Sequence, residues 1–169
     1  MTDRALTPKG TEKRPPKAVE RRHAHWTEAR SAVVFSPREP AWVPSGYWMS
    51  ALQSWRLANE EKGQILIATF TGPNGAYFTV EQTAIQQPSQ FEFKQSAPVD
   101  GGVSTGVVDI HGQPAQWRTG VPIGDPGSEA TSWDTSLVSV AWTEGTVLYR
   151  LDAKGLDVSA LMRVARSLG

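Results

Sequence analysis

From Ala41 onward, apolar and polar residues alternate with a period of two, in short runs separated by turn-forming residues. Such alternation is typical of half-buried strands, and the residues between the runs allow the chain to reverse. The pattern predicts a sheet of about seven strands joined by hairpins. The expected strands are 47–57, 64–70, 76–83, 103–110, 113–118, 136–143 and 146–151.

The most specific pairing is predicted around the turn Thr143-Glu144-Gly145-Thr146. Glycine at the second position of a two-residue loop suits a type I′ turn. A slip by one residue would move the apolar side chains to the other face, so the register is well specified. The expected pairs share one face: Trp142 opposite Val147, Val140 opposite Tyr149, and Val138 opposite Leu151.

Two further tight turns are predicted at His111-Gly112 and at Asn74-Gly75. Pro114 has no N–H to donate to a ladder, so the strand at 113–118 is expected to be an edge strand or to begin at a bulge.

One helix is predicted, and it follows the last strand. Asp157 is a good N-cap, and Leu161, Val164, Ala165 and Leu168 recur with the spacing of one helical face. A helix this short is unstable alone, so its apolar stripe must pack on the sheet. Strands followed by one helix predict an α+β fold, an antiparallel sheet with the C-terminal helix on one face.

The composition changes near residue 40, which divides the chain into two expected regions. Residues 1–39 form a basic, proline-rich stretch with few large apolar side chains, and residues 40–169 form the sheet-and-helix domain. A segment that buries little apolar surface does not offset its ordering entropy. We therefore expect residues 1 to about 32 to be mostly disordered.

Composition also excludes several classes of protein. The 17 basic and 17 acidic residues cancel, which argues against a nucleic-acid binder. The chain has no cysteine, so it has no disulfide and no thiolate metal site. It also lacks the long apolar run of a membrane-spanning helix and the apolar stretch of a signal peptide.

Three segments resemble the C-terminal, extracytoplasmic domain of bacterial membrane-anchored anti-sigma-factor-like regulators. They are Pro40-Ala41-Trp42-Val43-Pro44-Ser45-Gly46-Tyr47, then Val108-Asp109-Ile110-His111-Gly112-Gln113-Pro114-Ala115, and finally 139–151 running into the Leu156–Leu168 helix. The resemblance covers about residues 40–169, and its motifs are structural rather than chemical.

The resemblance implies a curved sheet wrapped on a helix, as in lipoprotein-carrier and periplasmic sigma-regulator domains. It also implies a non-enzymatic sensory domain on the extracytoplasmic face of a bacterial membrane, and without it a cytoplasmic location remains open. The family's membrane anchor and sigma-binding segment are missing from this chain. If an anchor precedes it, the basic stretch is expected to meet anionic lipid headgroups, and otherwise to act as a flexible tether.

No catalytic constellation emerges from the sequence, and no cofactor or metal is expected. His23 and His25 lie in the expected tail and His111 in a turn, so a metal site built from them is disfavoured. Asp125, Glu129 and Asp134 share a long loop but match no calcium-binding spacing. Glycines at 101, 102 and 106 are not followed by a helix and so form no phosphate cradle.

Aromatic residues are a better indication of function than charged ones, since the chain has seven tryptophans. Trp48 and Trp55 have opposite parity along one expected strand, so they share a face only if the strand is irregular. The face away from the helix is predicted to hold an apolar groove for a protein or lipid-like ligand. Its candidate ligand-binding residues are Trp48, Met49, Trp55, Tyr77, Trp117 and Trp133.

Three alternatives remain open. A lipid or lipoprotein carrier would need a large continuous apolar cavity, whereas a sensor needs only a patch. A structural interaction module would fill the groove with its own loop, 119–134. A hydrolase would need a nucleophile, a base and an orienting acid in one pocket.

Overall fold

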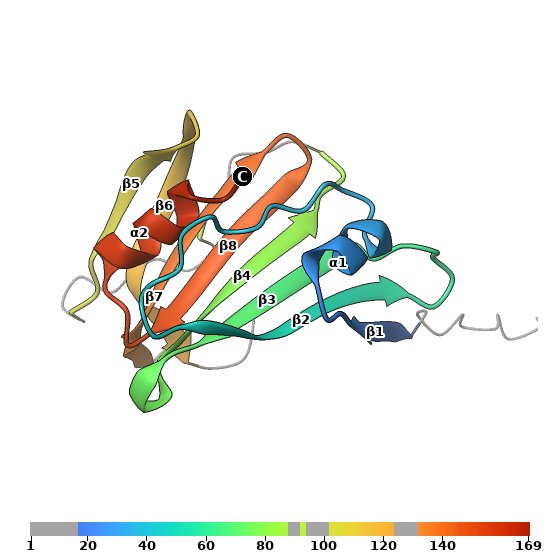
Figure 1. Cartoon of the computed structure of the whole chain (residues 1–169). Helices are drawn as coiled ribbons and strands as arrows, with labels where there is room; N and C mark the ends of the chain where they lie inside the picture. The colour runs from blue at the N-terminus through green and yellow to red at the C-terminus, as the bar shows by residue number, and fades with distance from the viewer. Residues whose placement is uncertain (1–16, 88–91, 94–101, 124–131) are drawn as a thin grey trace, which may run out of the picture.

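The computed structural model describes residues 17–87, 92–93, 102–123 and 132–169. Within them the chain forms one eight-stranded antiparallel sheet and two α-helices, with strand order β1-β2-β3-β4-β8-β7-β6-β5 (Figure 1). Three parts of the expected organisation lie outside the described residues: residues 1–16 of the tail, Gly101, and residues 124–131 of the expected loop, which include Asp125 and Glu129. The strands are β1 (Ala18–Arg22), β2 (Trp48–Leu57), β3 (Ile65–Thr71), β4 (Tyr77–Ala84), β5 (Thr105–Ile110), β6 (Gln113–Ile123), β7 (Ser132–Glu144) and β8 (Val147–Lys154); the helices are α1 (Trp26–Ala32), α2 (Val158–Arg166) and a single 3-10 turn, η1 (Pro73–Gly75).

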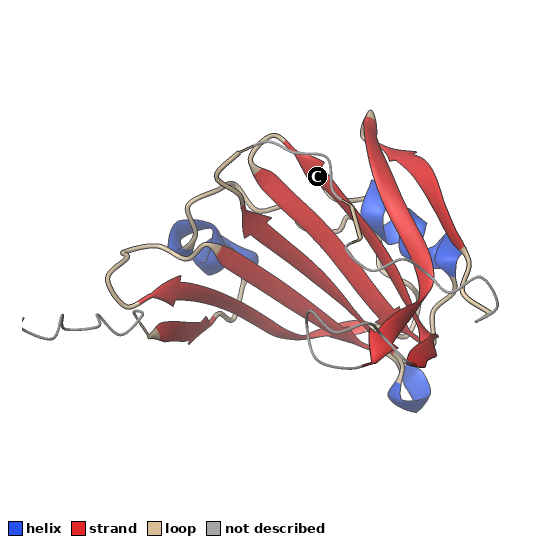
Figure 2. Ribbon diagram, turned by 180° about the vertical axis from the view of Figure 1, so that it is seen from behind, coloured by secondary structure: helices blue, strands red, loops and turns tan. Residues whose placement is uncertain are grey.

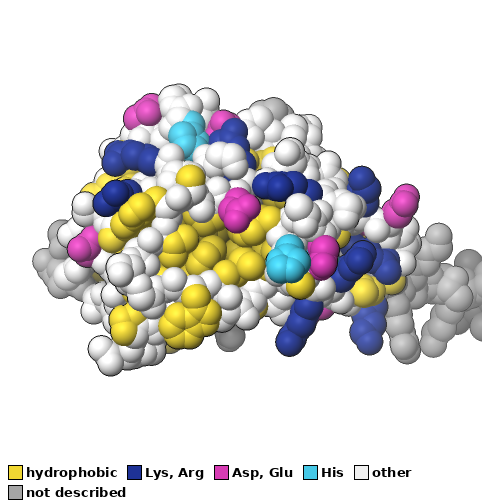
Figure 3. All heavy atoms as spheres, viewed as in Figure 1, with side chains coloured by type: hydrophobic (Ala, Val, Ile, Leu, Met, Phe, Trp, Pro, Cys, Tyr) yellow, Lys and Arg dark blue, Asp and Glu magenta, His cyan; other side chains and the backbone are white. Residues whose placement is uncertain are grey.

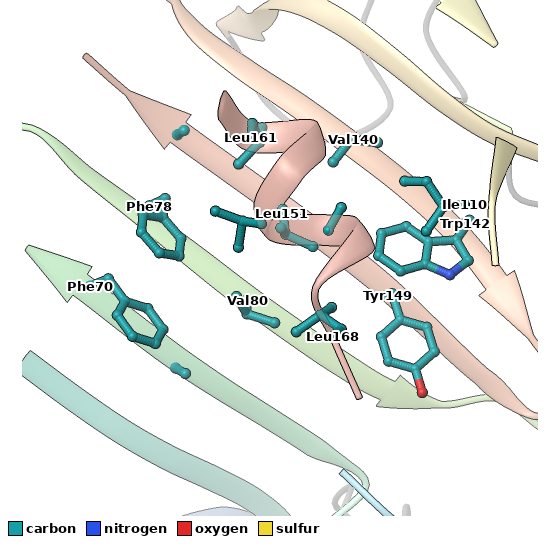
Figure 4. Close-up of a cluster of buried hydrophobic side chains, with 14 of the residues drawn as sticks. Phe70, Phe78, Val80, Ile110, Val140, Trp142, Tyr149, Leu151, Leu161 and Leu168 are labelled. Carbon is teal, nitrogen blue, oxygen red and sulfur yellow. The ribbon is translucent and has the colours of Figure 1, made fainter. Parts of the chain in front are cut away.

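The predicted α+β class is confirmed: a curved antiparallel sheet carries a C-terminal helix. Both α-helices lie on the same face, which we call the covered face, and the opposite side is the outer face (Figures 1 and 2). The alternating residues of the central strands bury their apolar side chains beneath α2 (Figure 4). Phe78, Val80 and Leu151 on β4 and β8 are fully buried there.

Helix α2 forms as the apolar spacing predicted. The Asp157 side chain accepts a hydrogen bond from the Ala160 N–H at 2.7 Å, which satisfies one of the free donors of the first turn. Leu161, Val164 and Ala165 are completely buried against the sheet. The helix is therefore stabilised by its packing on β7 and β8 rather than by its own length.

The β7–β8 hairpin shows the predicted faces but a different register. Trp142 lies opposite Tyr149 and Val140 opposite Leu151, whereas the predicted partner of each is the residue two positions earlier on β8. The loop is Gly145-Thr146, with Glu144 opposite Val147 and Gly145 at φ +59°. Glycine at the first loop position fits a type II′ turn, so both registers place glycine acceptably. A shift by two residues keeps the same side chains on the covered face.

The other two turns form as predicted. His111 and Gly112 have φ values of +53° and +78°, as a type I′ turn requires, and Ile110 lies opposite Gln113. Asn74, with φ +55°, and Gly75 connect β3 to β4.

The prediction of an edge strand at Pro114 was wrong. Strand β6 lies between β5 and β7, and β5 is the edge. Pro114 pairs with Asp109 of β5, and the pairing of β6 with β7 begins only at Gln116. The proline therefore precedes the part of β6 that needs donors on both sides.

The ordered fold begins well before residue 40. Residues 18–32, expected to be mostly disordered, form β1 and α1, and β1 pairs with β2 along its whole length. Trp26, Ala29 and Val33 are buried in the same core as the sheet residues. These few apolar side chains are enough to order the segment, because the backbone of β1 hydrogen-bonds to β2 and α1 packs on β2.

Residues 34–47, which we call the strap, cross the covered face from α1 to β2 (Figure 1). The side chain of Gln82, fully buried on β4, accepts from the Arg38 N–H at 2.8 Å and donates to the Arg38 carbonyl at 2.7 Å. Further along, Pro40 forms an antiparallel bridge with Leu168, and Ala41 donates its N–H to the Ser167 carbonyl. The strap is thus tied both to the sheet and to the segment after α2.

Candidate functional site

A groove of about 390 Å³ opens on the covered face between α1, the strap and the adjoining ends of β2 and β3. We call it the strap groove. Its apolar wall is formed by Trp26, Val43, Met49 and Phe70. Figure 3 shows hydrophobic side chains gathered in a hollow at the centre of this face. Its volume lies within the range of small-molecule sites.

The apolar wall is anchored in the core. Phe70 is 4% exposed and stacks on Phe78 with ring centroids 4.6 Å apart. Trp26 is 7% exposed, because the first turn of α1 turns it toward the sheet. These rings are rigid and pre-formed, so a ligand that enters the groove orders few side chains.

Polar groups stand at the rim. Arg30 of α1 and Glu39 of the strap approach to 3.7 Å, and each side chain is 47% exposed. Apart from this ion pair the Arg30 side chain makes no hydrogen bond to another described residue, so its guanidinium donors are available to an anion at the rim. His25, which also lines the groove, stands at the N-cap of α1 without a side-chain capping bond.

A bulge in β2 places Met49 in this groove and two tryptophans elsewhere. Met49 pairs with Phe70 and Ala51 with Thr69, so Ser50 is an extra residue in the ladder. The bulge reverses the parity of the strand, and Trp48 and Trp55 then share the outer face, opposite Thr71 and Ile65. This is the irregularity that would let both tryptophans share a face.

The six residues predicted to bind ligand are divided between the two faces. Register places Trp48, Trp55 and Tyr77 on the outer face, where Trp48 is 58% exposed. Met49 lies on the covered face, as does Trp117, which pairs with Val140 and packs against the core. Trp117 also lies over Gly106 of β5, where an added Cβ would meet its ring nitrogen at 2.6 Å.

The sixth residue, Trp133, belongs to a polar part of the outer face. Its ring lies 5.4 Å from the Arg118 guanidinium carbon, and the Phe93 ring lies 4.0 Å from the same atom. Arg118 is only 6% exposed, and burial together with the charge of Arg150 lowers its pKa. Trp133 therefore covers a buried cation and does not line the strap groove.

The first half of the strap carries a charged network. Arg38 donates two hydrogen bonds to the Glu144 carboxylate, at 2.6 and 2.7 Å. His111 lies 3.1 Å from an Arg38 nitrogen through Nδ1 and 3.1 Å from the Arg166 carbonyl through Nε2. Burial alone would raise the pKa of Glu144, but hydrogen bonding to Arg38 and the charges of Arg38 and His111 outweigh it, so that pKa is lowered. The network fixes the strap to both hairpin turns and to α2.

A serine–histidine pair lies between β1 and β2. His23 Nε2 is 2.8 Å from Ser54 Oγ, and both side chains are buried. The other ring nitrogen, Nδ1, has no hydrogen-bond partner in the part of the chain that the structure describes. Burial and the charge of Arg21 lower the pKa of His23, which keeps the ring neutral. No described acidic side chain accepts from His23 Nδ1, as the orienting acid of a catalytic triad would.

The three histidines have separate roles: a buried bond to Ser54, a helix N-cap, and the charged network. Within the described ranges, no group of three or more acidic or histidine side chains is arranged to hold a metal ion. Asp134 of the expected acidic loop accepts hydrogen bonds from Ser136 instead. The described helices are also too short or too polar to cross a bilayer.

Sequence reasoning missed most of the strap groove. Trp26 and Arg30 lay in the expected tail, and their spacing on one helix was a weak indication of an ordered segment. Val43 was named only within the segment 40–47 that carries the resemblance, and Phe70 only as the last residue of an expected strand. Comparisons of the chain with family models, with curated proteins and with solved structures gave no significant match.

Proposed function

We propose that this protein is a non-enzymatic binding domain whose strap groove takes a lipid-like ligand with an anionic head. The observation that carries the proposal is a groove of about 390 Å³ with one apolar wall and an accessible arginine at its rim. The apolar part of the ligand would lie against Trp26, Met49 and Phe70. The head would pair with Arg30 in place of Glu39.

The charge arrangement favours an anionic head over a neutral one. Arg30 and Glu39 stand 3.7 Å apart and are half exposed, so their mutual attraction is weak. A carboxylate or phosphate on a ligand bound in the groove is held close to Arg30 and accepts two N–H donors at once. When the anionic head replaces Glu39 as the partner of Arg30, little free energy is lost and directed hydrogen bonds are gained.

The binding event has a route to a regulatory output. Glu39 is adjacent in the chain to Arg38, which joins the strap to Glu144 and His111. A ligand that displaces Glu39 would thus act on the segment that ties α1, the hairpin turns and α2 together. This supports a sensory role in signalling through an anti-sigma-type regulator at an extracytoplasmic membrane face, as the sequence resemblance suggests.

Two alternatives differ in what they require. A lipid or lipoprotein carrier needs a longer enclosed cavity, and a groove of about 390 Å³ is at the small end of ligand sites. A protein-binding module would use the outer face, where Trp48 is exposed and Trp55, Ile65 and Tyr77 are half-buried. That exposed tryptophan is the observation that favours this second candidate.

The test titrates the full chain with laurate and with dodecanol, followed by calorimetry. We expect both to bind, with Arg30→Gln weakening laurate binding about tenfold and leaving dodecanol unchanged, as the loss of one charged hydrogen bond predicts. Arg22→Gln is the matched control, since that arginine is exposed on β1 away from the groove. Absence of saturable binding by either probe, or equal weakening of both by Arg30→Gln, would refute the proposal.

A further inference from the structure

The two edges of the sheet differ in how they are protected. Strand β1 forms one edge and β5 the other (Figure 2). An edge strand presents unpaired backbone groups, and soluble proteins usually blunt it with charge or with a short length. Edge β1 is short and carries Glu20, Arg21 and Arg22 among its five residues.

Edge β5 is about as short, with six residues, but it lacks the charge that protects β1 along most of its length. Its sequence is Thr-Gly-Val-Val-Asp-Ile, with a single charged residue near one end. Val107, at its middle, is 65% exposed, the highest value among the exposed large hydrophobic side chains of the described residues. An apolar side chain at the centre of an open edge is the pattern of a strand that pairs with another chain.

The turn at His111-Gly112 determines which backbone groups of β5 face outward. In a two-residue hairpin the residues that flank the loop exchange both hydrogen bonds, so Ile110 bonds to Gln113 of β6. The direction of the backbone groups alternates along the strand, so the N–H and C=O groups of Val108 and Gly106 also point toward β6. The N–H and C=O groups of Thr105, Val107 and Asp109 therefore point away from the sheet. None of these groups has a backbone partner among the described residues.

This outward row is complementary to itself. If a second β5 runs antiparallel about a two-fold axis at Val107, Val107 faces its own copy and Thr105 faces Asp109. Each of these pairs exchanges two backbone hydrogen bonds, because all the residues involved direct their groups outward. The arrangement places valine against valine and a hydroxyl against a carboxylate, with no like charges directly opposed.

We propose that β5 is a dimerisation edge, on which a second copy of this chain pairs antiparallel to make one continuous sheet across two protomers. The contact is isologous, and the remaining edge of each protomer is the charged β1. Association therefore closes at two chains and does not propagate into a fibre. The interface is distinct from the strap groove, which lies at the other end of the covered face.

The first test is sedimentation equilibrium of the full chain at concentrations up to about 0.5 mM, because a single strand pair is a small interface. We expect a mass that rises from 18.4 kDa toward twice that value. Val107→Lys should keep the chain at the monomer mass. Val34→Lys changes an exposed valine on the strap, and this control should associate as the wild-type chain does. A wild-type chain that stays monomeric throughout would overturn the proposal.

The second test uses the absence of cysteine from the chain. In a hydrogen-bonded antiparallel pair the Cα atoms are about 5.5 Å apart, which a disulfide can span. Val107→Cys should therefore form a covalent dimer under mild oxidation, and Val34→Cys should not. A dimer that forms in solution but crosslinks no faster through Val107→Cys than through Val34→Cys would place the interface elsewhere and overturn the assignment to β5.

Discussion

The two helices of the covered face pack on the same sheet in different ways. Helix α2 has a satisfied N-cap and buries Leu161, Val164 and Ala165 completely. Helix α1 has no side-chain cap bond, buries Trp26 and Ala29, and leaves a groove beside it. The end of the sheet under α2, the α2 end, is therefore a closed core. The end under α1, the α1 end, has an open groove. A binding site can be placed on this fold without weakening the part of the core that holds it together.

The largest effect is expected where packing is complete. Leu161→Ala removes a fully buried side chain from the α2 interface, and such truncations cost about 2–5 kcal/mol of unfolding free energy. Urea denaturation followed by circular dichroism measures this loss. Ser159→Ala, at an exposed position of the same helix, should change stability by less than about 0.5 kcal/mol. A comparable small change for Leu161→Ala would show that the α2 end is no better packed than the α1 end.

A smaller effect is expected where the strap joins the two ends. Gln82→Leu leaves the Arg38 N–H and carbonyl without their partner, and because Arg38 is only half-buried we expect a total cost of about 1–3 kcal/mol. Hydrogen exchange should show faster exchange at Arg38 and around Ala41, with α2 still protected. Glu81→Gln, the neighbouring residue on the outer face, should leave exchange in the strap unchanged. If Gln82→Leu accelerated hydrogen exchange equally in the strap and in α2, the two ends would open together.

The smallest effect is a dependence on pH at the α1 end. Because burial lowers the pKa of His23 below its ordinary value of 6.5, the unfolded chain binds more protons on acidification. The stability from neutral His23 is complete above pH 6.5 and declines as the pH falls below it, until the folded ring also titrates. His23→Gln should reduce the loss of unfolding free energy between about pH 7.5 and 5. His25→Gln, at the exposed N-cap, should retain it, and identical pH profiles for both variants would contradict this assignment.

The α2 end could be predicted from the sequence because its signals are local. Asp157 and the apolar spacing after it predict the helix from residues that are close in sequence. The period-two alternation likewise predicts which side chains of each strand face the core. The predicted hairpin register was wrong by two residues, because Glu144-Gly145 and Gly145-Thr146 both place glycine in the loop. In the observed register Trp142 stacks on Tyr149, with ring centroids 5.1 Å apart.

The α1 end could not be predicted because its signals are long-range. Residues 18–32 are highly charged, and nothing local indicates that β2 pairs with β1 or that Trp26 reaches the core. The bulge at Ser50 has no sequence marker such as glycine, yet it decides that Met49 lines the groove and Trp48 does not. Whether the six predicted residues bind a ligand stays a prediction.

The long reach of the strap has a consequence for how the chain folds. Arg38 and its neighbours find their partners at Glu144 and at residues 167–169, more than a hundred positions away. Docking of the strap closes a loop of more than a hundred residues, which costs more chain entropy than forming a hairpin. We therefore expect the local hairpins and α2 to form before the strap docks. Substitutions in the strap should then speed unfolding and leave the folding rate almost unchanged. The lifetime of the native state, rather than the speed of reaching it, is what this crossing segment controls.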